Sequence, residues 1–342
     1  MRLPPGNARN LGPVAGTGAE GAIPGIGAAD LGEIVQLPDG SFVAVFGDSF
    51  GGDKVGVGPH YPSVAVPVTF DEMGRPQFGE PLNGPVGGPN PLFIPPPQAR
   101  GTNALPAGSV VADGRTYMMA VGTTNLRPVG GSWLVQATND PSKGWKPIEG
   151  SWRPWSWRRW RRGAPTQISG YLGNDGKVYI AATSFDRSQG ISLYRTEPDT
   201  CTDRSTWRPY VRRRWGRPGR WAAPISQGQN FGEISLREVD DQVVLAGFNA
   251  TTGNVEVRVA DKPTQIFFEG AVTTIVDHKI MPQPYGGYIV PGSTLENLNI
   301  FVSQWNTLND AHGIPIGAPY NTQHIIANVN TSRPRRAGKE GE

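Results

Sequence analysis

Two aspartates lie nine residues on either side of Asp39 in this chain of 342 residues. Asp30 lies in the segment GAADLGEIVQL and Asp48 in VAVFGDSFGG, and the intervening Asp39-Gly40 has the composition of a tight turn. Two antiparallel strands joined at that turn would bring both carboxyl groups to the same end of one hairpin. Glycoside hydrolysis requires such a pair, because one carboxyl group protonates the leaving oxygen while the other acts as nucleophile or as base for water. The same side chains could instead cap backbone N–H groups at strand ends.

Other polar and aromatic residues are candidates for the same site. Glu233, in the apolar segment NFGEISLRE, could contact a substrate or form a buried ion pair with Arg237. Tyr285 and Tyr288, in PQPYGGYIVPGS, could stack on a sugar or pack between strands. Polar residues also end the remaining apolar runs, at Thr123, Ser184 with Asp186, Asn249 and Ser303.

The elements that must position these residues recur along the chain. A turn followed by a short β-branched run begins near residues 39, 113, 175, 241 and 297, at intervals of 56 to 74 residues. Each unit has the pattern of a β-hairpin. Five repeats that almost fill the chain predict an all-β, five-bladed β-propeller. We expect one propeller domain over residues 26–332, an N-terminal arm over 1–25 and a flexible polar tail over 333–342.

The composition supports this fold class and excludes several functions. Gly (46) and Pro (33) together disfavour long helices. The net charge of +3 argues against nucleic acid as a partner. The single Cys201 forms no intrachain disulfide, and the four histidines lack zinc-ligand spacing, so we expect neither a metal nor a cofactor. No apolar run reaches the roughly 18 residues of a membrane span.

Two related segments rich in tryptophan and arginine, WRPWSWRRW from Trp152 and WRPYVRRRW from Trp207, have no explanation in the hairpin pattern. They belong to residues 152–162 and 207–221. These segments could bind an anionic polymer, nucleic acid or a partner protein, or the arginines could simply stack on the indole rings. An assembly surface or a stacking ladder is favoured over nucleic-acid binding. We expect them to lie outside the catalytic face.

Several segments in this order carry a resemblance: ADLGEIVQLPDGSFVAVFGDSFGG, GTNALPAGSVVADGRTYM, GKVYIAATSFDRSQGISLYR, FGEISLRE and PYGGYIVPGSTLENLNIFVSQW. Over roughly residues 25–310 the chain resembles the domain-of-unknown-function family 4185, found in actinobacteria and their phages. This family is related to the five-bladed endo-D-arabinanases of glycoside hydrolase family 183, which cut the D-arabinan of mycobacterial arabinogalactan and lipoarabinomannan. The Trp/Arg-rich segments depart from the family pattern.

The resemblance implies a function and a site. It implies that Asp30 and Asp48 are the catalytic pair, with Asp48 as general acid and Asp30 as base or nucleophile. Residues in the other family motifs, together with Asn249, are expected to bind substrate: Arg187, Glu233, Arg237, Asn249, Tyr285 and Tyr288. The expected substrate is D-arabinan of the cell envelope. The alternative is a non-catalytic glycan-binding tail protein with the same fold.

The expected location follows from the start of the chain. The sequence MRLPPGNARNLGPVAGTG has no apolar stretch of the kind found in secretory signals. This fits a phage tail protein that reaches its substrate on the virion and has other tail proteins as partners. A secreted bacterial enzyme, extracellular and without its signal, is the other origin considered.

Overall fold

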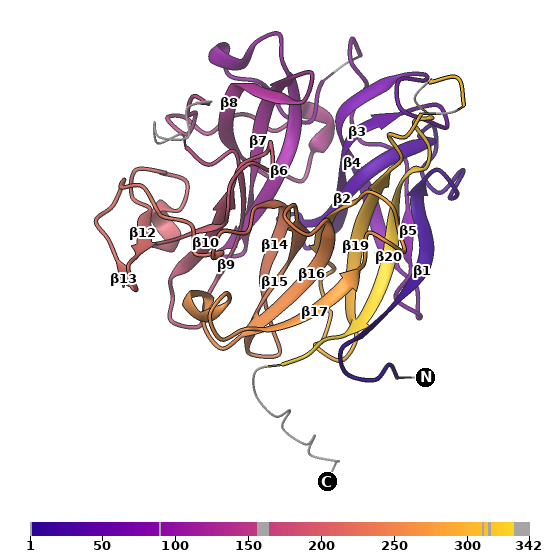
Figure 1. Ribbon diagram of the computed structural model, residues 1–342. Helices are drawn as coiled ribbons and strands as arrows, with labels where there is room; N and C mark the ends of the chain where they lie inside the picture. Colours follow the sequence, from indigo (N-terminus) through magenta and orange to yellow (C-terminus); the bar gives the residue numbers. More distant parts are fainter. Residues whose placement is uncertain (1, 89, 156–163, 310, 314–315, 332–342) are drawn as a thin grey trace.

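The computed structural model describes residues 2–88, 90–155, 164–309, 311–313 and 316–331 (Figure 1). These residues form twenty β-strands and four short 3-10 helices, and they contain no α-helix. The predicted all-β class is therefore confirmed. The helical turns are η1 (Pro97–Ala99), η2 (Pro141–Lys143), η3 (Pro198–Thr200) and η4 (Pro263–Gln265).

The strands form four hydrogen-bonded sheets. The first contains β2 (Ala28–Gln36), β3 (Phe42–Phe50), β4 (His60–Phe70) and β5 (Pro76–Phe78). The largest contains β6 (Asn103–Ala112), β7 (Arg115–Thr124), β8 (Arg127–Gln136), β9 (Gln167–Leu172), β10 (Val178–Thr183), β11 (Ser192–Thr196), β12 (Arg208–Val211) and β13 (Arg214–Trp215). The third contains β14 (Phe231–Val239), β15 (Gln242–Asn249), β16 (Asn254–Ala260) and β17 (Ala271–Val276). The fourth contains β18 (Pro284–Ile289), β19 (Leu298–Trp305), β20 (Tyr320–Asn328) and β1 (Asn7–Gly16).

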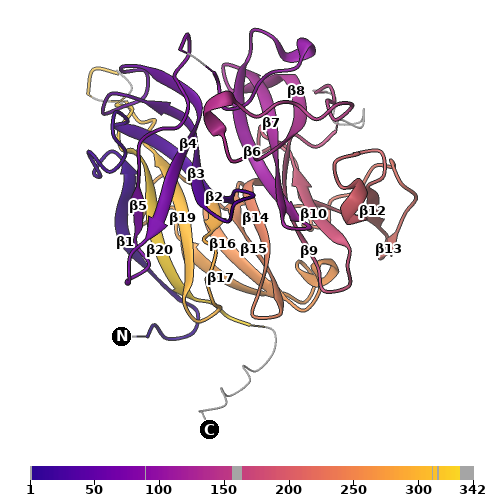
Figure 2. The same ribbon diagram turned by 180° about the vertical axis from the view of Figure 1, so that it is seen from behind.

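All five predicted hairpins form. The antiparallel pairs are β2–β3, β6–β7, β9–β10, β14–β15 and β18–β19. Their first strands lie next to one another at the centre of the molecule, since β6 contacts β9, β9 contacts β14, β14 contacts β18 and β18 contacts β2. Figure 2, from behind, shows β6 beside β3 and β4, as the contacts also require.

The eight-stranded sheet consists of two antiparallel groups whose strand pairing is limited to one residue pair. A single parallel pair, Val110 with Gly170, joins β6 to β9. The strands approach closely there, because a Cβ on Gly108 would lie 1.7 Å from the carbonyl oxygen of Ile168. Gly108 also has φ +88°, a conformation that favours glycine. Any side chain at this position would separate the two groups.

The core consists of apolar clusters between successive groups of strands. One cluster packs Val43 and Val45 of β3 against Met118 of β7 and Trp133 of β8. Others fill the spaces between the two groups of the large sheet, between β9–β11 and β14–β15, and between the third and fourth sheets. A further cluster joins the fourth sheet to the first. Because both faces of the inner strands are covered, even their polar residues, such as Glu33 and Ser169, are buried.

The N-terminal segment differs from the prediction. Residues 7–16, expected to belong to an arm, form β1 and pair antiparallel with β20, from Asn7 with Asn328 to Gly16 with Asn321. The sequence NARNLGPVAG conceals this strand, because it lacks a β-branched run and Pro13 interrupts the ladder at a register shift. Pairing with β20 holds residues 7–16 in the extended conformation of a strand. The predicted tail, 333–342, lies outside the described residues.

Candidate active site

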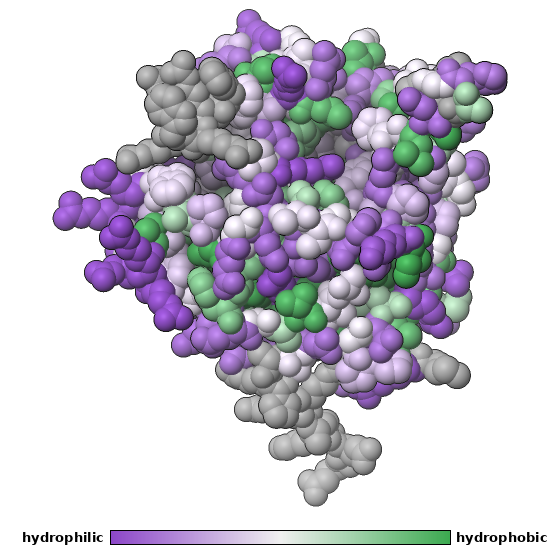
Figure 3. Space-filling view, in the orientation of Figure 1, coloured by the Kyte–Doolittle hydropathy of each residue, from purple (hydrophilic) through white to green (hydrophobic). Residues whose placement is uncertain are grey.

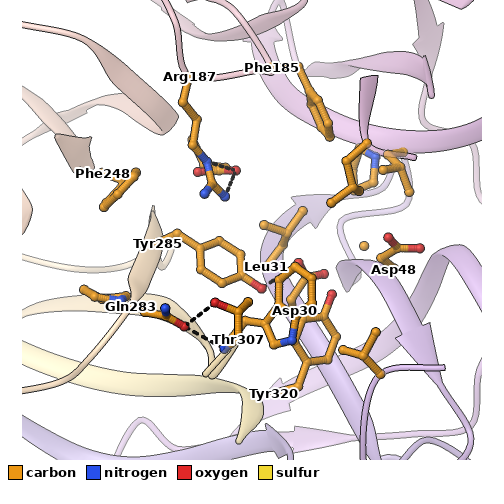
Figure 4. A pocket seen from close by; sticks show the side chains of 18 of the residues that line it. Asp30, Leu31, Asp48, Phe185, Arg187, Phe248, Gln283, Tyr285, Thr307 and Tyr320 are labelled. Atoms are coloured by element: carbon orange, nitrogen blue, oxygen red, sulfur yellow. Dashed lines mark hydrogen bonds and ion pairs between the residues drawn. The ribbon is translucent and has the colours of Figure 1, made fainter. Parts of the chain in front are cut away.

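A pocket of about 570 Å³ opens at the end of the first hairpin opposite its turn (Figure 4). Asp30 and Asp48 both line it, with side chains from the other central strands and their loops. The remaining lining residues are Leu31, Gly47, Val55, Leu105, Pro106, Leu126, Phe185, Asp186, Arg187, Glu233, Phe248, Gln283, Pro284, Tyr285, Trp305, Thr307 and Tyr320. Its volume is within the usual range for a small-molecule site.

An irregularity in β2 orients Asp30. The register with β3 shifts on both sides of Asp30, and Leu31 has a left-handed φ of 67°. This conformation is unfavourable for a branched side chain, so the surroundings must hold it. The Leu31 N–H donates to Ser303 Oγ (2.7 Å), and Thr322 Oγ1 donates to the Leu31 carbonyl oxygen (3.2 Å). Bulges of this kind commonly redirect a side chain beside an active site.

Asp30 is buried, and no cationic side chain in the described part of the chain forms an ion pair with it. Asp30 is only 8% exposed, and its Oδ2 accepts a hydrogen bond from the Tyr285 hydroxyl (2.9 Å). Burial, followed by the charge of Asp48, raises the pKa of Asp30 to about 7, and the Tyr285 and Tyr320 hydroxyls partly oppose this shift. Figure 4 shows Asp30 between Tyr285 and Asp48. A carboxyl group with this pKa can hold a proton near neutral pH.

Gly47 makes room for the Asp30 carboxyl group. The two residues are opposite each other in the β2–β3 ladder. A Cβ on Gly47 would lie 2.8 Å from Asp30 Oδ1 and 2.9 Å from the Leu31 side chain. The glycine of the segment FGDSF is therefore a steric requirement of the site.

Asp48 has a different environment. His60 Nε2 lies 2.5 Å from Asp48 Oδ1, and both side chains are about one quarter exposed (26% and 25%). The imidazole stacks on Phe50, with ring centroids 4.7 Å apart and an interplanar angle of 10°. Phe50 therefore fixes the ring that contacts Asp48. The sequence spacing of His60 had been weighed only for a metal site, and its place beside Asp48 depends on the β3–β4 pairing.

Arg187 and Glu233 form an ion pair on the opposite wall. Arg187 Nη2 lies 2.8 Å from Glu233 Oε1, and the guanidinium lies over the rings of Phe248 (5.3 Å) and Tyr285 (4.9 Å). The suggested pairing of Glu233 with Arg237 is thus wrong. Residues four apart in a strand are on the same face but about 13 Å apart. Glu233 Oε2 is buried without a hydrogen-bond partner in the described part of the chain.

Three residues expected to bind substrate do not line this pocket. Asn249 is fully buried, where Oδ1 accepts from the Thr251 N–H (3.1 Å) and Nδ2 donates to Glu256 (3.2 Å), so it stabilises the β15–β16 turn. Tyr288 is 2% exposed and packs in the core cluster between the first and fourth sheets. Arg237 lies in the space between the central strands, called the channel below. These three side chains make contacts within the fold and do not face this pocket, contrary to the expectation.

Arg237 connects four of the central strands. Its Nη2 contacts Glu33 (3.0 Å) and Ser109 (2.8 Å), and its Nη1 donates to Ser169 (2.9 Å). Glu33 also accepts a hydrogen bond from Ser109 (2.5 Å). The network therefore links β14 to β2, β6 and β9. On its far side Arg237 lines a second pocket of about 440 Å³, next to the hairpin turns.

Several pocket residues were missed by the sequence analysis. Aromatic side chains form much of the wall: Phe185, Phe248, Trp305 and Tyr320. Each lies near a strand end, but the sequence alone does not indicate which aromatic residues face a pocket. Asp186, beside Phe185, was noted only as a polar residue that ends a run.

The described residues of both Trp/Arg-rich segments lie outside this pocket. Trp152 donates to the Gly130 carbonyl oxygen (2.9 Å) at the outer side of β8. Residues 208–215 form the β12–β13 hairpin at the edge of the large sheet. Residues 156–162 of the first segment lie outside the described residues.

The described part of the chain contains no cluster of three or more His, Cys, Asp or Glu side chains suited to a metal ion. It also contains no helix with the length and apolarity needed to cross a bilayer.

Several solved structures with a similar fold are glycoside hydrolases. One is a family 117 glycoside hydrolase from the marine bacterium Zobellia galactanivorans, with TM-score 0.54 and 10% identity over 94% of this chain and 90% of that chain. Another is a family 43 beta-xylosidase/alpha-arabinofuranosidase from a compost metagenome, with TM-score 0.50 and 10% identity over 95% of this chain and 93% of that chain. The molecule thus has the propeller-like fold of glycoside hydrolases.

Sequence comparison then gives the family. The model of the domain of unknown function DUF4185 matches residues 19–324, so the chain belongs to the DUF4185 family. A relative, the "Uncharacterized 35.9 kDa protein in asd 3'region" of Mycolicibacterium smegmatis, is 40% identical over 321 residues, which cover 87% of this chain and 92% of the relative. The family resemblance is therefore confirmed.

Proposed function

We propose that the protein is an endo-D-arabinanase that cleaves the D-arabinan of the actinobacterial cell envelope, in arabinogalactan and lipoarabinomannan. The observation that carries the proposal is the pair Asp30 and Asp48 in one pocket, where one carboxyl group is buried with a raised pKa. Glycoside hydrolysis needs one carboxyl group that is protonated and one that is ionised. The fold of glycoside hydrolases and the mycobacterial relative support the reaction class and the setting.

The environments of the two aspartates suggest their roles. The resemblance to glycoside hydrolase family 183 made Asp48 the general acid. The raised pKa of Asp30 favours the reverse assignment, because a carboxyl group that keeps its proton near pH 7 is suited to protonate the leaving oxygen. Asp48, which is more exposed and contacts His60, then acts as nucleophile or as base for water. His60 positions Asp48.

The opposite wall provides contacts for a sugar. Glu233 Oε2 has no hydrogen-bond partner in the described chain and can accept from a sugar hydroxyl. Arg187, held over Phe248 and Tyr285, presents a guanidinium to the same space. Trp305 offers an apolar ring face. We assign these residues to substrate binding.

The repeat pattern supports a five-bladed propeller. We count the two groups of the eight-stranded sheet as separate blades, because one residue pair joins them and an apolar cluster lies between their faces. The other three sheets supply one blade each. Such a ring directs the ends of its inner strands toward one central site.

We propose that the enzyme acts on the envelope from outside, as a phage tail protein with other tail proteins as partners or as a secreted enzyme. A protein outside the cell can reach a polymer of the envelope. Virion fractions probed with an antibody to this chain would test the tail location, and its absence from purified virions would contradict it.

The deciding experiment is incubation of the purified protein with mycobacterial arabinogalactan. We expect release of arabino-oligosaccharides by the parent, and loss of at least about 1,000-fold in rate for Asp30→Asn and Asp48→Asn. Asp186→Asn is the matched control, since Asp186 is a third aspartate of the same pocket. Binding of the polymer without any release would instead support the non-catalytic glycan-binding protein.

A further inference from the structure

The second Trp/Arg-rich segment divides into a buried anchor and an exposed tip. Trp207 is 2% exposed, its Nε1 donates to the Cys201 carbonyl oxygen (2.9 Å), and Arg204 lies over its ring at 5.6 Å. Trp215 packs against Tyr210, with ring centroids 5.0 Å apart. These contacts fix the β12–β13 hairpin to the edge of the sheet. These contacts do not explain the arginines at the exposed end of the hairpin.

The turn of this hairpin has an unusual composition. Val211 pairs with Arg214, so the connection consists of Arg212 and Arg213 alone. Both have left-handed backbones, with φ 50° and 62°. Two-residue turns with two positive φ angles strongly favour Asn-Gly, and each arginine there costs on the order of 1 kcal/mol. Local folding therefore does not account for the two side chains.

The tip forms a cationic surface with exposed aromatic groups. Its arginines are all exposed: Arg208, Arg212, Arg213, Arg214, Arg217 and Arg220. None of them has a carboxylate partner among the residues that the structure describes. Trp221 is 50% exposed and Phe268 is 46% exposed, with the Arg213 guanidinium 5.7 Å from the Phe268 ring centre. In Figure 3 strongly hydrophilic side chains project at the left edge, where Figure 1 shows β12 and β13.

We propose that this arginine tip binds the surface of an anionic phospholipid bilayer. Guanidinium groups pair with phosphate through parallel hydrogen bonds, and tryptophan is favoured at the boundary between headgroups and acyl chains. The hairpin lies at the outer edge of the molecule in both ribbon views, which suits contact with a flat partner (Figures 1 and 2). A single-stranded nucleic acid would instead need a positively charged groove that follows its backbone.

The membrane contact is independent of the pocket. None of the tip residues lines the pocket that contains Asp30 and Asp48. Adsorption would therefore concentrate the protein at an envelope without changing its action on a soluble oligosaccharide. The inference goes beyond the proposed function and does not rely on it.

The test is sedimentation of the full chain with lipid vesicles. We expect binding to vesicles of equal parts phosphatidylcholine and phosphatidylglycerol, and much weaker binding to phosphatidylcholine alone. The double variant Arg212→Asn/Arg213→Gly introduces the preferred turn sequence, so it removes two charges while favouring the hairpin. Its partition should fall roughly 30-fold, about fivefold for each basic residue lost.

A control and a second readout distinguish the tip from net charge. Arg9→Gln/Arg100→Gln removes two exposed charges elsewhere and should bind within about twofold of the parent. Brominated acyl chains should quench the fluorescence of the parent more than that of Trp221→Phe. Equal weakening of the two double variants, or no binding of the parent to anionic vesicles, would overturn the proposal. Binding of a single-stranded oligonucleotide without binding of vesicles would also overturn it.

Discussion

Two acidic residues of β2, three positions apart, occupy contrasting parts of the central channel. Glu33, 3% exposed, contacts the guanidinium of Arg237 and the hydroxyl of Ser109. Asp30, 8% exposed, contacts a tyrosine hydroxyl and lies near a second carboxyl group, Asp48. The two have similar burial but opposite electrostatic surroundings. A buried charge with a cation contributes to structure, whereas one beside a like charge is retained at a cost to stability.

The bulge between them places both side chains in the channel. Residues three apart in a regular strand point to opposite faces. Here Asp30 pairs with Gly47, Leu31 with Phe46 and Glu33 with Val45, so Gly32 is an extra residue in the ladder. The irregularity in β2 therefore gives one strand both a structural and a candidate catalytic carboxylate.

The largest effect should come from breaking the central ion pair. Glu33→Gln leaves the Arg237 guanidinium buried without its counter-charge, and arginine does not release its proton. We expect the free energy of unfolding to fall by about 3–5 kcal/mol. Urea denaturation measures this change. A loss below about 1 kcal/mol would mean that the pair does not organise the channel.

Asp30→Asn should have the opposite effect on stability. The pKa of Asp30 is about 7 in the folded protein and about 4 when unfolded, so the folded state binds the extra proton between these values. The stabilisation of the folded state by this bound proton is fully present below about pH 4, and it is lost as the pH rises through 7. At about pH 8 the variant should be more stable than the parent by roughly 2–4 kcal/mol, with little difference at about pH 4. Equal stability at both pH values would contradict the raised pKa.

Gly47→Ala tests the packing around Asp30 with the carboxyl group kept. The added Cβ must displace the Asp30 carboxyl group or the Leu31 side chain, because both lie within 3 Å of it (2.8 and 2.9 Å). We expect kcat on arabinan to fall by about 100-fold. Gly79→Ala, just after β5 at the edge of the same sheet and outside the pocket, is the control, since its nearest neighbour, Pro67, would lie at 3.3 Å. Similar rates for both variants would show that placement of Asp30 is not critical.

The smallest effect concerns the partner of Asp48. His60→Ala should lower kcat by about 10-fold, because Asp48 loses the group that orients it. His60→Gln keeps an N–H donor and should recover part of the rate. Steady-state kinetics of the two variants measure this difference. Equal losses in both would assign His60 a packing role on Phe50.

The sequence predicted the fold better than the site. Turns such as Asp39-Gly40 and Asp113-Gly114 combine with β-branched runs, and this local pattern identifies hairpins wherever they occur. The same pattern predicted that Asp30 and Asp48 lie at one end of the first hairpin, and both residues line the same pocket. Residues 7–16 escaped prediction because their order comes from a partner strand at the other end of the chain.

The remaining site residues depend on pairings between distant strands. Tyr320 reaches Asp30 from β20, so no local spacing relates these two residues. His60 reaches Asp48 from β4, the next strand along the chain, and this contact depends on the β3–β4 register, which the turn pattern did not predict. The proposed pairing of Glu233 with Arg237 applied a spacing that brings residues together in helices but not in strands. These contacts are set by the tertiary structure and cannot be found from the spacing of the residues in the sequence.

The pairing of β1 with β20 has a consequence for folding during synthesis. The fourth sheet takes one strand from near the start of the chain and three from near its end, with Asn7 opposite Asn328. The ribosome therefore releases β1 long before its neighbour exists, while the hairpins between them can form in order. Completion of this sheet is necessarily a late event with a very long sequence separation, which slows folding. Until β20 has been synthesised, residues 7–16 have no strand with which to pair.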